Sequence, residues 1–339
     1  MLPRNQPMIS NYRNVTFLLL FLLGVGGCVQ PEVAPKSPAF ARPGEQLLAA
    51  GVRSFTYGDY PSAMHFFKKA LVVGRGVDDV SGIAQAEVNM AETALSMGEV
   101  KQAQNHLLEA QRLTEREGLE GFAPRLEMIS ASIAIREGRG DEALSILAPY
   151  LTNTNGVHDA NGFSDEIRLA ALISRTELAV SAADRKLVRY WTKQYRQALM
   201  GMGAIHPRFQ ARLFRFEARL AHWDGKLQER DEFLRQAVKI YRDELARPGL
   251  AAVLAEWGQY LEEEKDRDGA RDRFDRALFV RVEMQDRYGS ERVLALLEEL
   301  DADNAQGQRL EETRRWRAVI SKKHPAMWGG LIEKRNPIR

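Results

Sequence analysis

The stretch LLAAGVRSFTYGDYPSAMHFFKKAL (Leu47–Leu71) determines how the rest of this 339-residue chain is interpreted, because its small and apolar residues recur later at a fixed spacing. Four separate columns repeat at intervals of 40 residues: Gly51, Ala91 and Ala131; Gly58, Gly98 and Gly138; Ala63, Ala103 and Ala143; and Phe67, Leu107 and Leu147. Agreement in four columns indicates an internal repeat rather than a coincidence.

The same pattern returns towards the carboxyl end. Gly258, Ala270, Phe274 and Ala277 fall in the matching columns, and Ala218, Gly225, Leu234 and Ala237 do so one period earlier. Between the two halves, residues 168–195 form a degenerate unit without the turn glycine, in which Leu187 occupies a small-residue column. Glycines fall at turns and no long alternating stretch indicates strands, so we predict an all-α chain. The repeat array spans 44–284 and contains about six helical hairpins, near 44–77, 84–117, 124–157, 168–201, 211–244 and 251–284.

The unit Leu47–Leu71 resembles a tetratricopeptide repeat (TPR). In this resemblance Gly51 lies where the two helices of a unit cross, Gly58-Asp59-Tyr60 forms the turn, and Ala63 lets the second helix approach the first. The resemblance implies a TPR-like α-solenoid with a concave groove lined by the first helix of each unit. The period of 40 exceeds the usual length of about 34, so longer helices or longer loops must absorb the difference.

Residues 285–339 follow the array and are predicted to be a capping helix pair and a basic tail. The helices are expected at Glu291–Leu300 and Arg309–Lys323, and Leu310, Trp316, Val319 and Ile320 mark one apolar face of the second. A terminal repeat needs a cap with a polar outer side. The excess of Lys and Arg over 309–339 is either a solvated surface or a contact for an acidic partner or anionic lipid headgroups.

The first 28 residues have the layout of a signal peptide: Arg4 and Arg13, then the apolar run Val15–Leu23, then small residues. The sequence Val25-Gly26-Gly27-Cys28 resembles a bacterial lipobox, and Cys28 is the only cysteine. This resemblance implies that residues 1–27 are removed and that Cys28 is acylated with fatty acids such as palmitate. An ordinary signal peptide and an uncleaved short anchor are the alternatives. Val29 in place of Asp implies outer-membrane delivery, and residues 28–43, which contain Pro31, Pro35 and Pro38, are predicted to be an extended tether.

Charge and motifs argue against several other kinds of function. Without residues 1–27, the chain has 46 Lys and Arg against 46 Asp and Glu, which gives no reason to expect a nucleic-acid partner. No two of the six histidines have the spacing of a helical metal pair, and no phosphate or dinucleotide loop and no nucleophile motif is found. Glu262-Glu263-Glu264, beside Lys265 and Arg267, is interpreted as a solvated ion-pair surface. We therefore expect no catalytic residues, no metal and no cofactor, and we do not expect an enzyme.

The candidate binding residues lie in two predicted groove helices. In PRFQARLFRFEARLAHW, Arg208, Arg212, Arg215, Arg219 and His222 share one helical stripe. These arginines either grip carboxylates of a ligand or pair with internal acids such as Glu217 or Glu177. On the matching stripe of the first unit lie Leu48, Val52 and Phe55. A groove that is apolar at one end and basic at the other favours an amphipathic or acidic peptide.

The leading hypothesis is a membrane-anchored TPR lipoprotein of the bacterial cell envelope, an outer-membrane protein that faces the periplasm. It would act as a protein–protein interaction adaptor or assembly factor, with a protein or peptide in the concave groove. The alternatives are a cell-wall (peptidoglycan) enzyme or glycan-binding accessory protein, and a structural spacer. A catalytic glutamate with a raised pKa in the groove would favour the enzyme.

Overall fold

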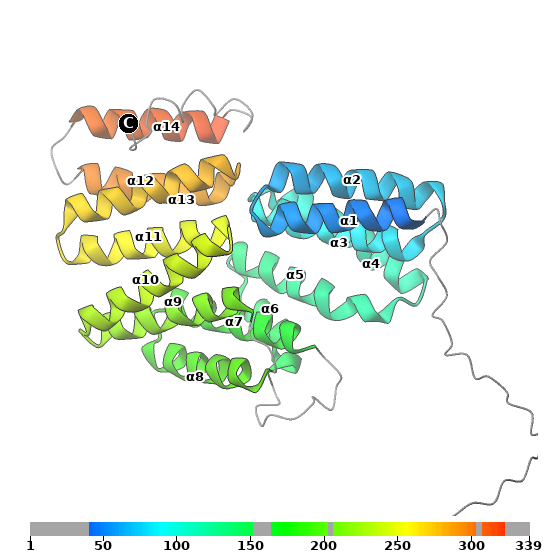
Figure 1. Cartoon of the computed structure of the whole chain (residues 1–339), viewed down its shortest axis with the longest axis horizontal. Coiled ribbons are helices and arrows are strands. Elements are labelled where there is room, and N and C mark those ends of the chain that lie inside the picture. Colours follow the sequence, from blue (N-terminus) through cyan, green and yellow to red (C-terminus); the bar gives the residue numbers. More distant parts are fainter. Residues whose placement is uncertain (1–40, 152–163, 203–205, 303–306, 323–339) are drawn as a thin grey trace, which may run out of the picture. The chain divides into compact units, whose positions relative to one another are not determined.

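The computed structural model describes residues 41–151, 164–202, 206–302 and 307–322, and these residues form helices and turns without any strand. Figure 1 shows the order of the helices along the chain. The helices are α1 (Ala41–Thr56), α2 (Tyr60–Gly76), α3 (Val80–Ser96), α4 (Val100–Arg116), η1 (Glu120–Phe122), α5 (Ala123–Arg136), α6 (Gly140–Leu147), η2 (Ala148–Tyr150), α7 (Asp165–Ser181), α8 (Arg185–Gly201), α9 (Pro207–Trp223), α10 (Leu227–Asp243), α11 (Arg247–Glu263), α12 (Arg267–Glu283), α13 (Arg287–Ala302) and α14 (Gly307–Lys322).

Consecutive helices pack as hairpins, from α1 with α2 to α13 with α14 (Figure 1). The predicted all-α solenoid of helical hairpins is therefore confirmed. The predicted capping pair corresponds to α13 and α14, which form a further hairpin with α13 against α12, and Trp316 and Ile320 are buried as expected.

Long helices account for the repeat length of 40. Helices α2, α3 and α4 each have 17 residues and are separated by turns of three residues. Among the described residues, ten turn residues have a positive φ, and they recur every 20 residues from Gly58 to Gly138 and again from Gly225 to Gln285. They are Gly58, Asp78, Gly98, Gly118, Gly138, Ala183, Gly225, Leu245, Lys265 and Gln285. Half of these residues are not glycine, which is why the sequence displays the 40-residue period more clearly than the 20-residue one.

Glycine in α1 and α11 lets an aromatic ring from the second helix of the hairpin approach the backbone. A Cβ on Gly51 would lie 2.3 Å from the Phe67 ring, and one on Gly258 would lie 2.5 Å from the Phe274 ring. Both phenylalanines are almost completely buried. The repeat position of Gly51 and the repeat position of Phe67 are therefore the two sides of one contact between backbone and ring. This contact occurs near both ends of the array.

The α7–α8 hairpin departs from this pattern. Ala183 takes the position of the turn glycine, with φ +52°. Counted from this turn, Val188 corresponds to Ala63, so the register assigned to Leu187 was one residue off. Val188 is fully buried, whereas Leu187 is only partly buried. In the same register Thr192 stands where Phe67 and Phe274 stand in their hairpins.

The odd-numbered helices form one layer of the array. Helix α1 contacts α3, α3 contacts α5, α5 contacts α7, and α9 contacts α11, whereas no two even-numbered helices contact each other to a comparable extent. Because the odd-numbered helices lie closer together, their layer is the inner side of the stack, as the repeat resemblance implies.

The turn of the first hairpin touches the start of α11, far along the sequence. Arg247 Nε donates a hydrogen bond to the Tyr57 carbonyl oxygen at 2.8 Å. A Cβ on Gly58 would lie 3.0 Å from Pro248 Cδ. We refer to this contact, together with the one described next, as the seam.

The second part of the seam joins the second and third hairpins to the start of α13. A Cβ on Gly98 would lie 2.5 Å from the Tyr288 Cβ. The Arg136 guanidinium carbon lies 4.4 Å from the centroid of the Tyr288 ring, and Arg287 lies 3.9 Å from the Glu99 carboxylate. The seam thus brings residues of the first three hairpins against the sixth and seventh.

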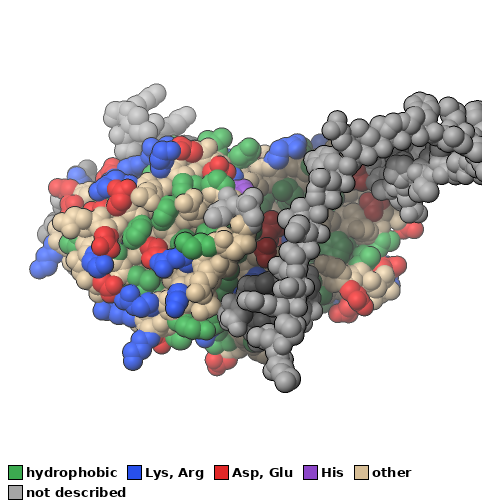
Figure 2. All heavy atoms as spheres, turned by 60° about the horizontal axis from the view of Figure 1, so that its bottom comes forward, with side chains coloured by type: hydrophobic (Ala, Val, Ile, Leu, Met, Phe, Trp, Pro, Cys, Tyr) green, Lys and Arg blue, Asp and Glu red, His purple; other side chains and the backbone are tan. Residues whose placement is uncertain are grey.

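Charged and hydrophobic side chains are interspersed on the face that Figure 2 shows. None of the described helices combines the length and the hydropathy needed to cross a membrane. The predicted signal peptide, residues 28–40 of the predicted tether and most of the basic tail lie outside the described residues. The last three residues predicted to belong to the extended tether, 41–43, are instead the start of α1.

Candidate functional site

The arginine stripe of α9 faces acidic residues of α7, α10 and α11. Arg212 Nη1 donates to Glu177 Oε1 at 2.7 Å, and Arg208 Nη2 donates to the Glu244 carbonyl oxygen at 3.1 Å. Of the two acids considered as internal partners, Glu177 thus binds a stripe arginine, whereas Glu217 binds Arg196 of α8. The side chains of Arg212 and Glu177 are 30% and 37% exposed, so water can exchange with this pair.

Arg215 is the buried member of the stripe. Its side chain is 6% exposed, and Nε and Nη2 donate to the two carboxylate oxygens of Glu256 at 2.9 and 2.5 Å. Burial alone would raise the pKa of the Glu256 carboxyl, but the charge and hydrogen bonds of Arg215 outweigh it and lower that pKa. Both groups are therefore charged at neutral pH and hold α9 against α11.

Arg219 differs from the rest of the stripe. Its guanidinium carbon lies 5.0 Å from the centroid of the Tyr260 ring and 5.9 Å from that of the Trp223 ring. Within the described part of the chain we find no hydrogen bond or ion pair from its guanidinium. The aromatic rings restrict its orientation while its N–H donors remain available for a ligand.

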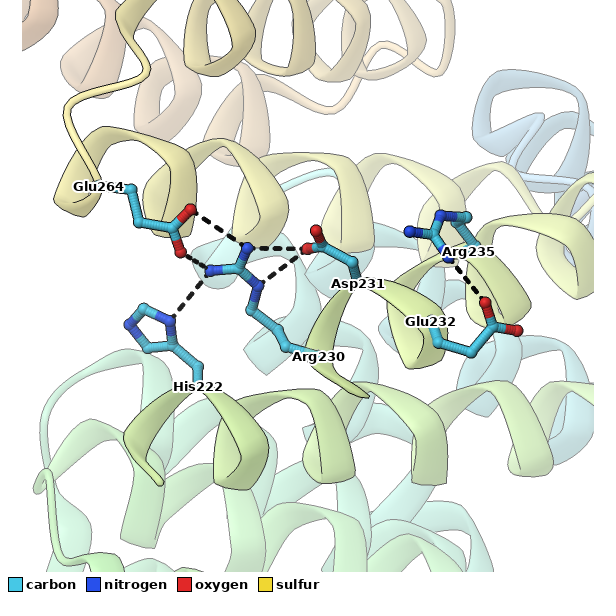
Figure 3. Close-up of polar contacts among 6 residues, drawn as sticks. All are labelled: His222, Arg230, Asp231, Glu232, Arg235 and Glu264. Atoms are coloured by element: carbon cyan, nitrogen blue, oxygen red, sulfur yellow. Dashed lines mark hydrogen bonds and ion pairs between the residues drawn. The ribbon is translucent and has the colours of Figure 1, made fainter. Parts of the chain in front are cut away.

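His222 and the buried Arg230 extend the site at the end of α9. His222 stacks on Tyr260 with 4.3 Å between ring centroids, and its Nε2 lies 2.7 Å from the Glu263 carboxylate. Figure 3 shows Arg230 between His222, Asp231 and Glu264, and its side chain is only 1% exposed. Arg230 Nη1 lies 3.3 Å from His222 Nδ1.

This cluster changes the interpretation of two stretches of sequence. Glu263 and Glu264 bind His222 and Arg230 and are not simply a solvated run beside Lys265. Arg230 itself was missed, because the sequence ERDEF resembles an exposed helix surface. Its guanidinium is buried by tertiary contacts, with His222 of α9 on one side and Glu264 after α11 on another.

The first-unit residues lie on α1 with different exposures. Leu48 and Phe55 are partly buried against the core of the first hairpins, whereas Val52 is 46% exposed. Val52 lines a cavity of about 270 Å³ with Tyr57, Arg208 and Leu245. Val52 and Arg208 belong to the two predicted groove helices, and both line this cavity beside the seam.

No cluster of three or more potential metal ligands occurs among the residues that the structure describes. Cys28, the predicted lipidation site, lies outside them. Three described carboxyls have a lowered pKa, Glu232 through hydrogen bonds from Gln236 and Arg235, Glu298 through hydrogen bonds from Arg317 and Arg314, and Glu256 through Arg215 against the effect of burial.

The sequence matches no known protein-family model and no curated protein. The class to which this chain can be assigned is therefore that of its architecture, an all-helical solenoid of stacked hairpins.

Proposed function

We propose that this protein is a lipid-anchored adaptor or assembly factor of the bacterial cell envelope, an outer-membrane lipoprotein on the periplasmic side. It binds a carboxylate-bearing segment of a protein partner on the inner layer of odd-numbered helices. The observation that carries this proposal is Arg219, a positioned guanidinium whose donors are unused in the described part of the chain.

The chemistry of Arg219 suits a carboxylate. A guanidinium presents parallel N–H donors that match the two oxygens of an aspartate or glutamate side chain or of a chain terminus. Stacking on Tyr260 reduces the orientational freedom that binding would otherwise remove. Arg212 lies two helical turns before Arg219, and its half-exposed pair with Glu177 leaves it able to contact the same ligand.

Arg219→Gln is expected to weaken capture of the main partner from envelope extracts by about tenfold or more, because a charge-assisted hydrogen bond is lost. The measurement is quantitative mass spectrometry of proteins retained by the purified full chain. Arg235→Gln is the matched control, since Arg235 is on α10 and, among the described residues, forms an ion pair with Glu232 one turn away and with no other acid. Equal recovery of every partner by the Arg219→Gln and Arg235→Gln proteins would argue against this site.

Cys28 carries the membrane part of the proposal. We expect radiolabelled palmitate to be incorporated into the wild-type protein in cells and not into a Cys28→Ala protein, because no other cysteine is present. The Cys28→Ala protein should also leave the membrane fraction, since the apolar run Val15–Leu23 is short for a bilayer span. An unlabelled wild-type protein that remains in the membrane fraction would support the uncleaved anchor instead.

The pKa of Glu256, the carboxyl paired with the arginine stripe, is lowered, which is opposite to the change that a general acid in a cell-wall enzyme needs. For this carboxyl the shift favours a structural or binding role over that of a general acid.

A further inference from the structure

Helix α8 carries positive charge without compensation from its own sequence. Over Arg185–Gly201 it has five Lys and Arg and no Asp or Glu. We call Arg185, Lys186, Arg189, Tyr190 and Lys193 the α8 basic face. Tyr190 is 49% exposed in the middle of these cations. The lower side of Figure 1, where α8 lies, comes forward in Figure 2, and Lys and Arg side chains lie there among hydrophobic ones.

Neighbouring helices neutralise only part of this charge. Arg189 Nη2 lies 2.8 Å from the Asp224 carboxylate, and Arg196 binds Glu217. The Arg185 guanidinium lies over the Trp223 ring, 5.5 Å from its centroid. For Lys186 and Lys193 no ion pair with another described residue is found. The face therefore presents cations that attract an anionic partner.

Two adjoining cavities lie along this face, a shallow one that is open to solvent and a deeper one between helices. One, of about 420 Å³, is lined by the α8 basic face alone. The other, of about 280 Å³, lies between α8, α9 and α10 and shares Arg189 and Lys193 with the first. Its apolar lining is Leu220, Ala221 and Phe233. The three acids that also line it, Glu217, Asp224 and Glu229, are each paired with a cation, Arg196, Arg189 and Lys226 respectively, so Lys193 is the lining cation without a pair among the described residues. Cations thus border a recess that can accept an apolar side chain.

Thr192 adds a polar group to this recess. Thr192 is 1% exposed, lines the second cavity, and its hydroxyl has no hydrogen-bond partner in the part of the chain that the structure describes. A buried unpaired hydroxyl is unfavourable unless a ligand or water satisfies it.

We propose that the α8 basic face and the adjoining recess bind an acidic peptide segment that carries one apolar side chain. Its carboxylates contact Lys186, Arg189 and Lys193, and the apolar side chain lies on Leu220, Ala221 and Phe233. The distance from Arg185 to Arg196 along the helix axis is about 17 Å, which an extended peptide of about five residues covers. The recess favours a peptide over a lipid surface, because flat headgroups have no side chain to place in it.

This site uses other cations than the one around Arg219, although the two adjoin at α9, where the Arg185 and Arg219 guanidinium groups both lie over the Trp223 ring. Helix α8 is even-numbered and lies outside the layer formed by the odd-numbered helices. The proposed function could fail while this inference holds, and the reverse is equally true.

The test uses the full chain and a fluorescein-labelled peptide of glutamates with one central leucine, followed by fluorescence anisotropy at low ionic strength. The Lys186→Gln/Lys193→Gln protein should bind the peptide about tenfold more weakly than wild type. Lys68→Gln/Lys69→Gln is the matched control, because both lysines are exposed on α2. This control should bind as wild type does.

Two further arms identify the ligand chemistry. An all-glutamate peptide of equal length should bind more weakly than the leucine-containing one, and equal affinity would overturn the role of the recess. Vesicles of phosphatidylglycerol are compared with the same two double variants. If Lys186→Gln/Lys193→Gln leaves peptide binding unchanged, or weakens only vesicle binding, the inference is wrong and, in the second case, the surface belongs to lipid.

Discussion

Replacing Arg215 with alanine is expected to lower the free energy of unfolding by about 3–5 kcal/mol. The substitution removes the partner of the Glu256 carboxylate at a place where Arg215 itself is only 6% exposed. Burial disfavours the charged carboxylate, and the guanidinium that now outweighs this effect would be gone. The cost therefore comes mainly from an uncompensated charge between α9 and α11.

Chemical unfolding followed by far-ultraviolet circular dichroism measures this change. Arg212→Ala is the matched control on the same stripe, and it should cost below about 1 kcal/mol because its ion pair with Glu177 is partly exposed. A double variant, Arg215→Met with Glu256→Leu, should recover most of the stability, since no unpaired charge remains. Similar losses for Arg215→Ala and Arg212→Ala would contradict the structural role of Arg215.

Gly98→Ala is expected to destabilise the protein by about 2–5 kcal/mol, through two additive causes. Gly98 has φ +82°, a conformation that costs an alanine energy. The added methyl group would also lie 2.5 Å from the Tyr288 Cβ and 3.1 Å from the Tyr288 nitrogen. The Tyr288 backbone and Cβ atoms cannot move away by a side-chain rotation, so α13 would have to shift away from the Gly98 turn.

Gly138→Ala separates the two causes. Gly138 holds the corresponding turn position with φ +75°, and a Cβ there meets no atom within 4 Å. Its substitution should cost only the backbone term of about 1–2 kcal/mol. The excess loss of Gly98→Ala in thermal or chemical unfolding then reports the seam contact, and equal losses for both variants would mean that the contact contributes nothing.

Most of the fold was predictable because the repeat imposes local constraints. Gly51 and Phe67 recur together because a ring lies on a backbone, and the sequence shows both members of that contact. The α7–α8 unit was predicted with a shifted register because Ala183 supplies a positive φ without being glycine. A turn with a positive φ is hard to predict from one sequence when a residue other than glycine occupies it.

For the candidate site, the sequence predicted which arginines share one side of α9 but not what each of them contacts. The spacing of Arg208, Arg212, Arg215 and Arg219 placed them on one side of a helix, but it could not distinguish a buried arginine from an available one. Arg215 is buried because Glu256, 41 residues later, lies against it. That contact depends on how successive hairpins stack, which local periodicity does not encode.

The seam has a consequence for how the molecule unfolds. In a linear array whose repeats contact only their neighbours, terminal repeats can fray while the middle stays folded. Here Arg247 donates a hydrogen bond to the Tyr57 carbonyl across 190 residues of sequence, so the first hairpin cannot detach without exposing the start of α11. The first hairpin and α11 thereby share part of their stability, and we expect the described helices to unfold more cooperatively than a linear array of the same length.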